Sequence, residues 1–226
     1  MQPLTAIVLG ATGLVGGHLV EKLLMDDTFE KVRILVRRPV NLTHKKLEVH
    51  VVNFDNLVDF RTRLGSGDCI FCCIGTTQKQ VKGDKAAYRK IDYDIPVNAA
   101  KMGKDASFKK YVLVSSVGAN ASSKSFYLKL KGEAEKAIAE QHFESFHVFR
   151  PGVLFGKRKE VRLGELIGKG VMNALPFLLT GTLKKYRGID AADVAEAMVA
   201  ASKLSVKGMV VHHFEDMMRM AKKVRR

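Results

Sequence analysis

Three polar side chains near the middle of the sequence are of the types that transfer protons. Tyr127 and Lys131 are four residues apart, so on a helix both project from the same face. A tyrosine hydroxyl has a pKa of about 10 and reacts poorly near neutral pH unless a neighbouring ammonium stabilises the phenolate. Ser116 could hydrogen-bond the same substrate oxygen, with Ser115 as the alternative. The three residues predict acid–base catalysis at an oxygen atom, in which Tyr127 donates or accepts the proton.

A Tyr-x-x-x-Lys pair is also common by chance on the surface of any helix. Its position after a predicted strand that leads into Ser115-Ser116 is what favours a catalytic role. A pair of this kind that serves a redox reaction needs a cofactor within reach. The N-terminal part of the chain contains a motif for one.

The segment Gly10-Ala11-Thr12-Gly13-Leu14-Val15-Gly16 follows an apolar run and opens an amphipathic helix. In that context Gly10 allows a tight turn, Gly13 lets the backbone approach a pyrophosphate, and Gly16 lets the helix pack closely on the strand. The N–H groups at the start of the helix then bind the anion. An ordinary glycine-rich turn is the alternative interpretation, but the strand and helix on either side favour a nicotinamide dinucleotide.

Two arginines, Arg37 and Arg38, follow the second apolar run, where an NAD-binding protein carries an acidic residue. An arginine binds phosphate through its forked guanidinium group, whereas an acidic residue accepts hydrogen bonds from the ribose hydroxyls. The pair therefore predicts NADP(H) as the cofactor, with solvated surface charge as the alternative. Asp55, just after the third apolar run, is a further candidate for a contact with the adenine amino group.

Apolar runs alternate with helical stretches along the chain, which is the pattern of βαβ units around a parallel sheet. We expect a doubly wound parallel sheet of the α/β class, the Rossmann fold, in a single domain. Predicted strands cover residues 6–9, 32–36, 47–52, 69–74, 111–114, 146–149 and 209–213. Predicted helices cover residues 14–25, 85–102 with a kink or restart at Pro96, 127–141, 191–202 with Asp190 as its cap, and 216–224.

The chain of 226 residues is long enough for one well-buried α/β domain. We assign residues 1–226 to one NAD(P)-binding domain, in which residues 151–185 and 204–226 form small substrate-side and C-terminal elements. No internal repeat or low-complexity linker divides it.

The formal net charge of +15 raises the question of a polyanionic partner. The basic residues are spread along the chain, and no aromatic residues alternate with them to make a base-stacking platform. This distribution argues against nucleic-acid binding. It favours a solvated surface with a few phosphate contacts to a dinucleotide.

Cys69, Cys72 and Cys73 lie in one apolar run that is typical of a buried parallel strand. No second group of cysteines or histidines completes a metal site, so we interpret them as buried thiols and expect no metal. An odd number of thiols is typical of a reducing compartment, and no apolar run reaches the length needed to span a bilayer. Since the N-terminus also has no signal-peptide pattern, these features predict a cytoplasmic protein.

The motifs together resemble the extended or atypical branch of the short-chain dehydrogenase/reductase family, in particular its Tat-interacting oxidoreductase-like proteins and their bacterial relatives. The similarity runs from about residue 5 to residue 202. The segments that carry it are Leu9–Gly13, Val36–Arg38, Phe71–Thr77, Leu113–Ser116, Tyr127–Glu133 and Phe149–Leu154.

The resemblance implies an NADP(H)-dependent oxidoreductase that acts on a small-molecule carbonyl or alcohol substrate. The predicted catalytic residues are Ser116, Tyr127 and Lys131. The motifs and the resemblance together predict a cofactor site that comprises Gly10, Thr12, Gly13, Leu14, Val15, Gly16, Arg37, Arg38, Asp55, Ile74, Gly75, Thr76, Tyr127, Lys131, Leu154 and Arg162.

Two other functions stay open. A regulatory protein would use NADP(H) to control a protein partner with little or no turnover, although such domains often lose the tyrosine. A nucleotide-sugar epimerase also uses tyrosine and lysine, but it usually needs a larger lobe than the short region after Pro151. A homo-oligomer and a protein partner are both compatible with the sequence, and no pattern in it identifies the substrate.

Overall fold

The centre of the protein is a parallel sheet of seven strands. The computed structural model describes residues 3–156 and 180–224. Across the sheet the strands stand in the order β3 (Leu47–Val51), β2 (Phe29–Val36), β1 (Leu4–Leu9), β4 (Cys69–Cys72), β5 (Lys110–Val114), β6 (Ser145–Phe149) and β9 (Gly208–His212). Every pair of neighbours is parallel, and the order reverses between β1 and β4. Sheets of this kind bind ligands at the carboxyl ends of the strands where the order reverses.

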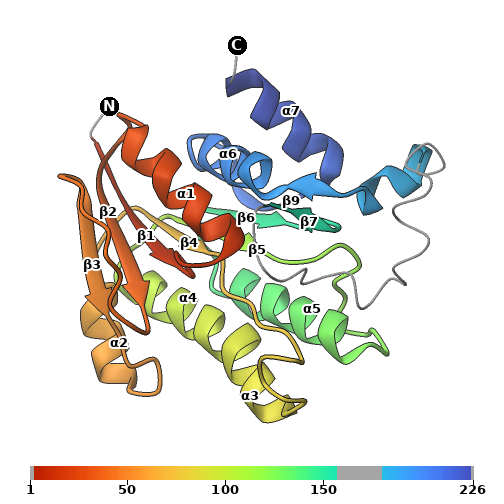
Figure 1. Ribbon diagram of the computed structural model, residues 1–226, viewed down its shortest axis with the longest axis horizontal. Helices are drawn as coiled ribbons and strands as arrows, with labels where there is room; N and C mark the ends of the chain where they lie inside the picture. Colours follow the sequence, from red (N-terminus) through yellow and green to blue (C-terminus); the bar gives the residue numbers. More distant parts are fainter. Residues whose placement is uncertain (1–2, 157–179, 225–226) are drawn as a thin grey trace.

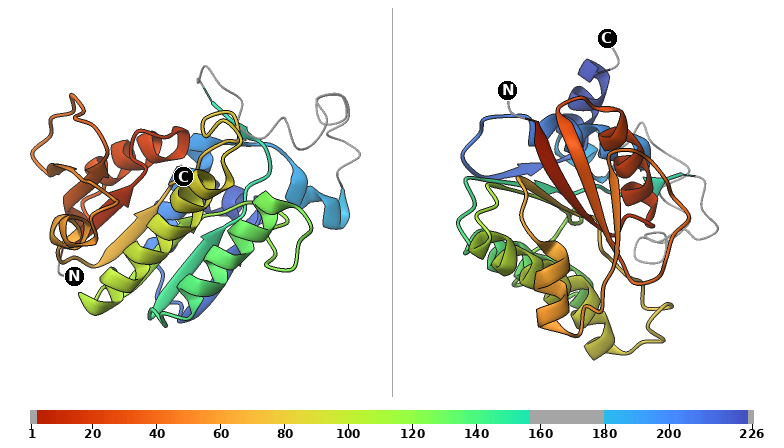
Figure 2. Two further views of the ribbon diagram at one scale, coloured as in Figure 1. Left: turned by 90° about the horizontal axis from the view of Figure 1, so that it is seen from below. Right: turned by 90° about the vertical axis from the view of Figure 1, so that its left-hand side faces the viewer.

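Helices cover both faces of this sheet (Figures 1 and 2). On one face lie α1 (Leu14–Met25), α6 (Ala191–Ser202) and α7 (Phe214–Val224). On the other face lie α2 (Leu57–Leu64), α4 (Ile95–Asp105) and α5 (Phe126–Ala139), with the short α3 (Lys85–Arg89) next to α4. The arrangement is a doubly wound Rossmann fold in a single domain, which confirms the predicted fold class.

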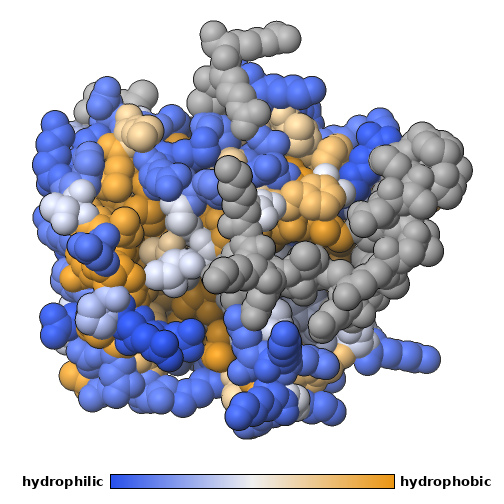
Figure 3. Space-filling model, viewed as in Figure 1, coloured by the Kyte–Doolittle hydropathy of each residue, from blue (hydrophilic) through white to orange (hydrophobic). Residues whose placement is uncertain are grey.

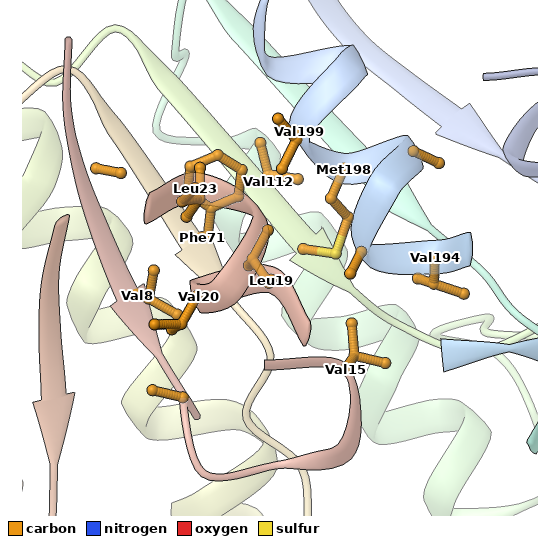
Figure 4. Packing of buried hydrophobic residues seen from close by; sticks show 14 of the residues in the cluster. Val8, Val15, Leu19, Val20, Leu23, Phe71, Val112, Val194, Met198 and Val199 are labelled. Atoms are coloured by element: carbon orange, nitrogen blue, oxygen red, sulfur yellow. The ribbon is translucent and has the colours of Figure 1, made fainter. Parts of the chain in front are cut away.

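Each face of the sheet buries its own apolar cluster. Under α1 and α6, Phe71 of β4 packs among Leu19 and Met198 (Figure 4). Central strands have helices on both faces, so they appear in the sequence as continuous apolar runs. Cys69 and Cys72 are fully buried in this way, which confirms that both are buried thiols.

Each strand and helix predicted within residues 3–156 and 180–224 corresponds to an element of the structure, but the sequence analysis misses α2 and the small second sheet described below. Asn56 caps this helix by accepting hydrogen bonds from the backbone N–H groups of the first turn, and Gly65 ends it with a φ of +62°. Phe60 and Leu64 are buried, whereas Val58 is 75% exposed. The helix has only eight residues, too few for the spacing of its apolar residues to stand out, so its caps are the clearest signal.

The helix predicted over residues 85–102 is divided at Pro96, as expected. It consists of α3, a π-helical turn (Lys90–Asp94) and α4, with Pro96 in the first turn of α4. A proline has no N–H, and its ring displaces the carbonyl group four residues earlier, which here belongs to Asp92. The helix therefore widens around Asp92, and the side chain of this acidic residue is buried.

The last part of the chain completes the main sheet and builds a small second sheet beside it. β7 (Leu154–Phe155) and β8 (Ile189–Asp190) form a parallel pair, and a 3-10 helix (Gly181–Tyr186) precedes β8. Gly156 approaches Leu14 at the start of α1, so the small sheet lies at the carboxyl edge of the main one. β9 pairs with β6, and α7 joins the cluster under α6, so residues 208–224 extend the core fold.

Candidate active site

The turn between β1 and α1 leaves no room for a side chain at Gly10 or Gly16. Gly10 has a φ of +81°, and a Cβ there would lie 2.7 Å from the backbone carbonyl of Cys73 at the exit of β4. A Cβ on Gly16 would lie 2.1 Å from the Gly10 carbonyl oxygen, which also accepts a 2.9 Å hydrogen bond from the Gly13 N–H. The turn, the β4 exit and α1 therefore meet backbone to backbone, as a dinucleotide turn requires.

The first turn of α1 is arranged to receive an anion. Gly13 is the N-cap, and no side-chain hydrogen bond caps this helix. The N–H groups of Leu14, Val15 and Gly16 stand at the positive end of the helix dipole. A serine or aspartate cap would occupy the position that a phosphate needs, so the glycine cap fits the pyrophosphate of a dinucleotide.

Two adjoining cavities extend from this turn. The first has a volume of about 200 Å³ and lies between residues 10–13 and residues 73–76. The second has a volume of about 490 Å³ and lies beside residues 51–55. Both are lined by Arg37, Phe54, Ile91 and Ile95. On the face drawn in Figure 3, hydrophobic side chains lie in a hollow near the middle of the molecule, with hydrophilic side chains around it.

The predicted contacts with the adenosine half lie around the second cavity. Arg37 lines both cavities, and Arg38 is exposed beside it. Asp55 lines the second cavity, where its carboxylate lies 2.7 Å from the Lys90 ammonium. Asp55 therefore already has a cationic partner within the protein.

Lys131 is a buried cation. Its ammonium lies 2.9 Å from Oδ1 of Asp92, and the two side chains are 6% and 0% exposed. Burial opposes the charge, but the Asp92 carboxylate and the neighbouring Tyr127 together raise the pKa of Lys131 above its ordinary value of 10.5. Lys131 therefore remains an ammonium group at physiological pH.

Asp92 is a site residue that the sequence analysis misses. Its Oδ2 accepts a 2.7 Å hydrogen bond from the Thr76 N–H. A Cβ on Gly75 would lie 3.5 Å from Oδ1 of Asp92 and 3.7 Å from the Lys131 ammonium, so the ion pair lies directly behind the wall of the first cavity. The available signal is an acidic residue on the inner stripe of a helix, three positions before the buried Ile95.

Tyr127 lies in the first turn of α5, one turn before Lys131, and is partly exposed. Its ring packs edge to face against Tyr88, with 6.3 Å between the centroids, and the Tyr88 hydroxyl donates a 3.0 Å hydrogen bond to the Thr76 carbonyl. The tyrosine is thereby held near the segment that follows β4. The structure thus brings the predicted Tyr127, Lys131, Gly75 and Thr76 to one place.

The two serines after β5 differ in their hydrogen bonds. Both are buried. The Ser115 hydroxyl donates to the carboxylate of Glu135 on α5, whereas the Ser116 hydroxyl donates to the Val117 carbonyl at 3.3 Å. Ser115 is therefore bound to an internal acid.

The remaining predicted residues are Ile74, Thr12, Leu154 and Arg162. Ile74 and Thr12 line the first cavity. Leu154 in β7 packs against the cluster under α1 and α6. Arg162 belongs to residues 157–179, which lie outside the described ranges.

A sequence profile described as NAD(P)H-binding matches residues 10–203 of the chain. The protein FMP52 of Coccidioides immitis is 35% identical over 216 residues, which cover 90% of this chain and 87% of that protein. The protein HTATIP2 of Rattus norvegicus is 34% identical over 179 residues, which cover 78% of this chain and 73% of that protein.

Solved structures with this fold include sugar-nucleotide enzymes. A UDP-N-acetylglucosamine 4-epimerase from Methanobrevibacter ruminantium is 16% identical with a TM-score of 0.68, and the match covers 94% of this chain and 77% of that one. The enzyme WbmH of Bordetella bronchiseptica, solved with NAD+, is 14% identical with a TM-score of 0.68, and the match covers 93% and 75% of the two chains. At such identities the likeness shows the fold alone.

The prediction of a cytoplasmic location is wrong. The relatives from Coccidioides immitis, Candida albicans and Debaryomyces hansenii are all named as mitochondrial proteins. Thiol count and the lack of a long apolar run do not separate one compartment of the cell from another. Among residues 3–156 and 180–224, no helix combines the length and the apolar character needed to cross a bilayer.

The glycine turn and the profile agree on a site for a nicotinamide dinucleotide, and the solved structures share the Rossmann fold that carries it. The chain therefore belongs to the NAD(P)H-binding family, as an atypical relative of the short-chain dehydrogenases/reductases, which confirms the resemblance of its motifs.

Proposed function

We propose that the protein is an NADP(H)-dependent oxidoreductase that interconverts a carbonyl compound and an alcohol. The observation that carries this proposal is the position of the Lys131 ammonium. It lies behind Gly75 at the wall of the first cavity, with Tyr127 one helical turn away. A phenol, a fixed cation and a nicotinamide site within one region are the parts that such a reaction needs.

The nicotinamide, when bound, supplies or accepts the hydride. Tyr127 passes the accompanying proton to the substrate oxygen in reduction and takes it back in oxidation. Lys131 is held as a cation by Asp92, so it stabilises negative charge on the phenol oxygen and need not itself change its protonation state.

Ser116 is the serine we assign to the substrate oxygen. The Ser115 hydroxyl is bound to the Glu135 carboxylate, whereas within the described part of the chain the Ser116 hydroxyl donates to the neighbouring Val117 carbonyl at 3.3 Å. A 3.3 Å hydrogen bond to an adjacent carbonyl is easily exchanged for one to a substrate.

Arg37 supports the choice of NADP(H) over NAD(H). It lines the cleft after β2, where its guanidinium group can bind a phosphate on the adenosine ribose. We further assign residues 151–185 to the substrate side of the cleft; of these the structure describes residues 151–156, which include β7, and residues 180–185.

The test measures cofactor binding and turnover separately. Purified protein is titrated with NADPH, and the fluorescence of the cofactor is followed. NADPH oxidation is then measured with a panel of aldehydes, ketones and quinones. We expect Tyr127→Phe to bind NADPH within about twofold of the wild type and to lose at least about 100-fold in rate, since only the proton donor is removed.

Tyr93→Phe is the matched control, because Tyr93 packs under the Arg89 guanidinium at 4.0 Å and has no assigned role in the site. Equal rates in the wild type and Tyr127→Phe would contradict the catalytic assignment. A wild-type protein that binds NADPH but oxidises it with no member of the panel would instead favour the nucleotide-sensing function.

A further inference from the structure

One buried carboxylate joins the ends of two neighbouring strands at the site. Glu135 on α5 is 2% exposed. It accepts a hydrogen bond from the Ser115 hydroxyl, which follows β5. Its two oxygens also accept hydrogen bonds from Nε and Nη2 of Arg150, which follows β6; the bond from Nε is 3.1 Å long. The charge of Glu135 is thus matched by a two-pronged arginine contact, and the serine hydroxyl adds a third hydrogen bond to the carboxylate.

The same two strand ends are joined by backbone hydrogen bonds on either side of Ser116. The Ser115 N–H donates to the Phe149 carbonyl at 2.7 Å, and the Val117 N–H donates to the Pro151 carbonyl at 2.9 Å. Ser116 therefore lies on a short segment whose two flanking residues are both fixed to the β6 exit.

Glu135 also continues the face of α5 that faces the site. Tyr127, Lys131 and Glu135 follow one another at four-residue steps, so they form one stripe along the helix. Lys131 connects the stripe to the β4 exit through Asp92 and Thr76, and Glu135 connects it to the β5 and β6 exits. One helix face thereby sets the positions of three adjacent strand ends.

We propose that Glu135 is a positioning residue that acts through Ser116: by holding Ser115 and Arg150, it fixes the distance between the Ser116 hydroxyl and the Tyr127 phenol on the same helix. The inference rests on the proposed oxidoreductase function. Glu135 touches neither substrate nor cofactor in this scheme, so it should affect turnover and leave cofactor binding unchanged.

The test is a double-mutant cycle between Glu135→Gln and Ser116→Ala, with a carbonyl substrate from the panel. We expect Glu135→Gln to lower kcat about tenfold, with KM and the Kd for NADPH within about twofold, because the serine is displaced and not removed. In the Ser116→Ala background the same substitution should cause no further loss, since the residue that it positions is already absent.

Glu133→Gln is the matched control, because Glu133 lies on the same helix, is 31% exposed and contacts Arg89 and Lys129 at the surface. If Glu135→Gln does not fold, Ser115→Ala takes its place in the cycle, because it removes only the hydroxyl contact. Losses that multiply in the double variant would overturn the proposal for Glu135 and leave the oxidoreductase function intact. A wild type without turnover of any substrate would overturn both.

Discussion

At the scale of single residues, the least ordinary group is the Lys131 ammonium. Burial alone would lower its pKa, but the Asp92 carboxylate at 2.9 Å reverses the sign. The folded-state pKa of Lys131 therefore lies above the ordinary value of 10.5, and while Asp92 is ionised the stability from this shift is fully present below that pH. The contribution of Lys131 is lost as the pH rises through its folded-state pKa.

We predict that Asp92→Asn destabilises the protein at pH 7 by about 3 kcal/mol, because it leaves Lys131 charged and buried without a partner. The Asn oxygen can still accept the hydrogen bond from the Thr76 N–H, so the loss of stability measures the effect of removing the carboxylate charge. Urea unfolding at pH 7 measures it. Asp55→Asn is the control, because its ion pair with Lys90 is more than half exposed and should contribute no more than about 0.5 kcal/mol. Equal losses in the two variants would contradict the assignment.

The preference for NADP(H) also belongs to single residues. We predict that Arg37→Ala raises the Kd for NADPH at least about tenfold and changes the Kd for NADH less than about twofold, because only NADPH carries the additional phosphate. Titrations of both cofactors by fluorescence provide the comparison. Arg38→Ala shows whether the exposed neighbour shares the contact. A parallel loss for NADPH and NADH would assign Arg37 to the pyrophosphate instead.

At the scale of elements, the close packing of α1 against the end of β1 depends on the absence of a side chain at Gly16. We predict that Gly16→Ala destabilises the protein by at least about 2 kcal/mol and abolishes NADPH binding, because the new Cβ would lie 2.1 Å from the Gly10 carbonyl oxygen. Gly17→Ala is the control in the same turn. Its Cβ would lie 3.8 Å from the Ala11 carbonyl oxygen, so it should stabilise the helix by about 0.5–1 kcal/mol. Thermal unfolding with and without NADPH distinguishes the two.

The sequence predicts most elements because their physical signals are local. Residues 6–9 of β1, 69–72 of β4 and 111–114 of β5 are continuous apolar runs, as expected of strands that are covered on both faces. α2 is missed because a helix of eight residues is too short for the spacing of Phe60 and Leu64 to stand out from the surrounding sequence.

The site is predictable only where one element carries the whole motif. The glycine turn and the Tyr127–Lys131 pair each lie within a few consecutive residues, so their spacing is informative. Asp92 and Glu135 act through partners on other elements, Lys131 for the first and Ser115 and Arg150 for the second. The role of Asp92 depends further on the π-helical turn before Pro96. The proline predicts an interruption of the helix there, but not that the turn buries the Asp92 side chain.

At the scale of the whole molecule, the outer part of the sheet contains a buried histidine pair. Nδ1 of His147 on β6 lies 2.9 Å from Nε2 of His212 on β9, and Nε2 of His147 lies 3.0 Å from the Ser145 hydroxyl. Burial first, then His212 and Lys110, lower the pKa of His147 from 6.5 to about 4. Burial also lowers the pKa of His212, although Asp216 opposes this effect.

We predict that the protein loses stability in mild acid, because between pH 6.5 and pH 4 His147 binds a proton in the unfolded chain but stays neutral in the folded protein. The contribution is complete above about pH 6.5 and falls by on the order of 2–3 kcal/mol between pH 6.5 and pH 4. Unfolding by urea at several pH values measures this slope. His147→Gln should flatten it, even if the variant is less stable at pH 8. The exposed His44→Gln serves as the control, and an unchanged slope in His147→Gln would contradict the prediction.

On its outer side β6 pairs with β9, which together with α7 follows α6 in the sequence. A ribosome that has released residues only up to about 205 therefore presents a nascent domain with the backbone donors and acceptors of β6 unpaired and one side of α6 uncovered. During that interval the incomplete domain exposes an unpaired strand edge and apolar helix surface, to which chaperones can bind.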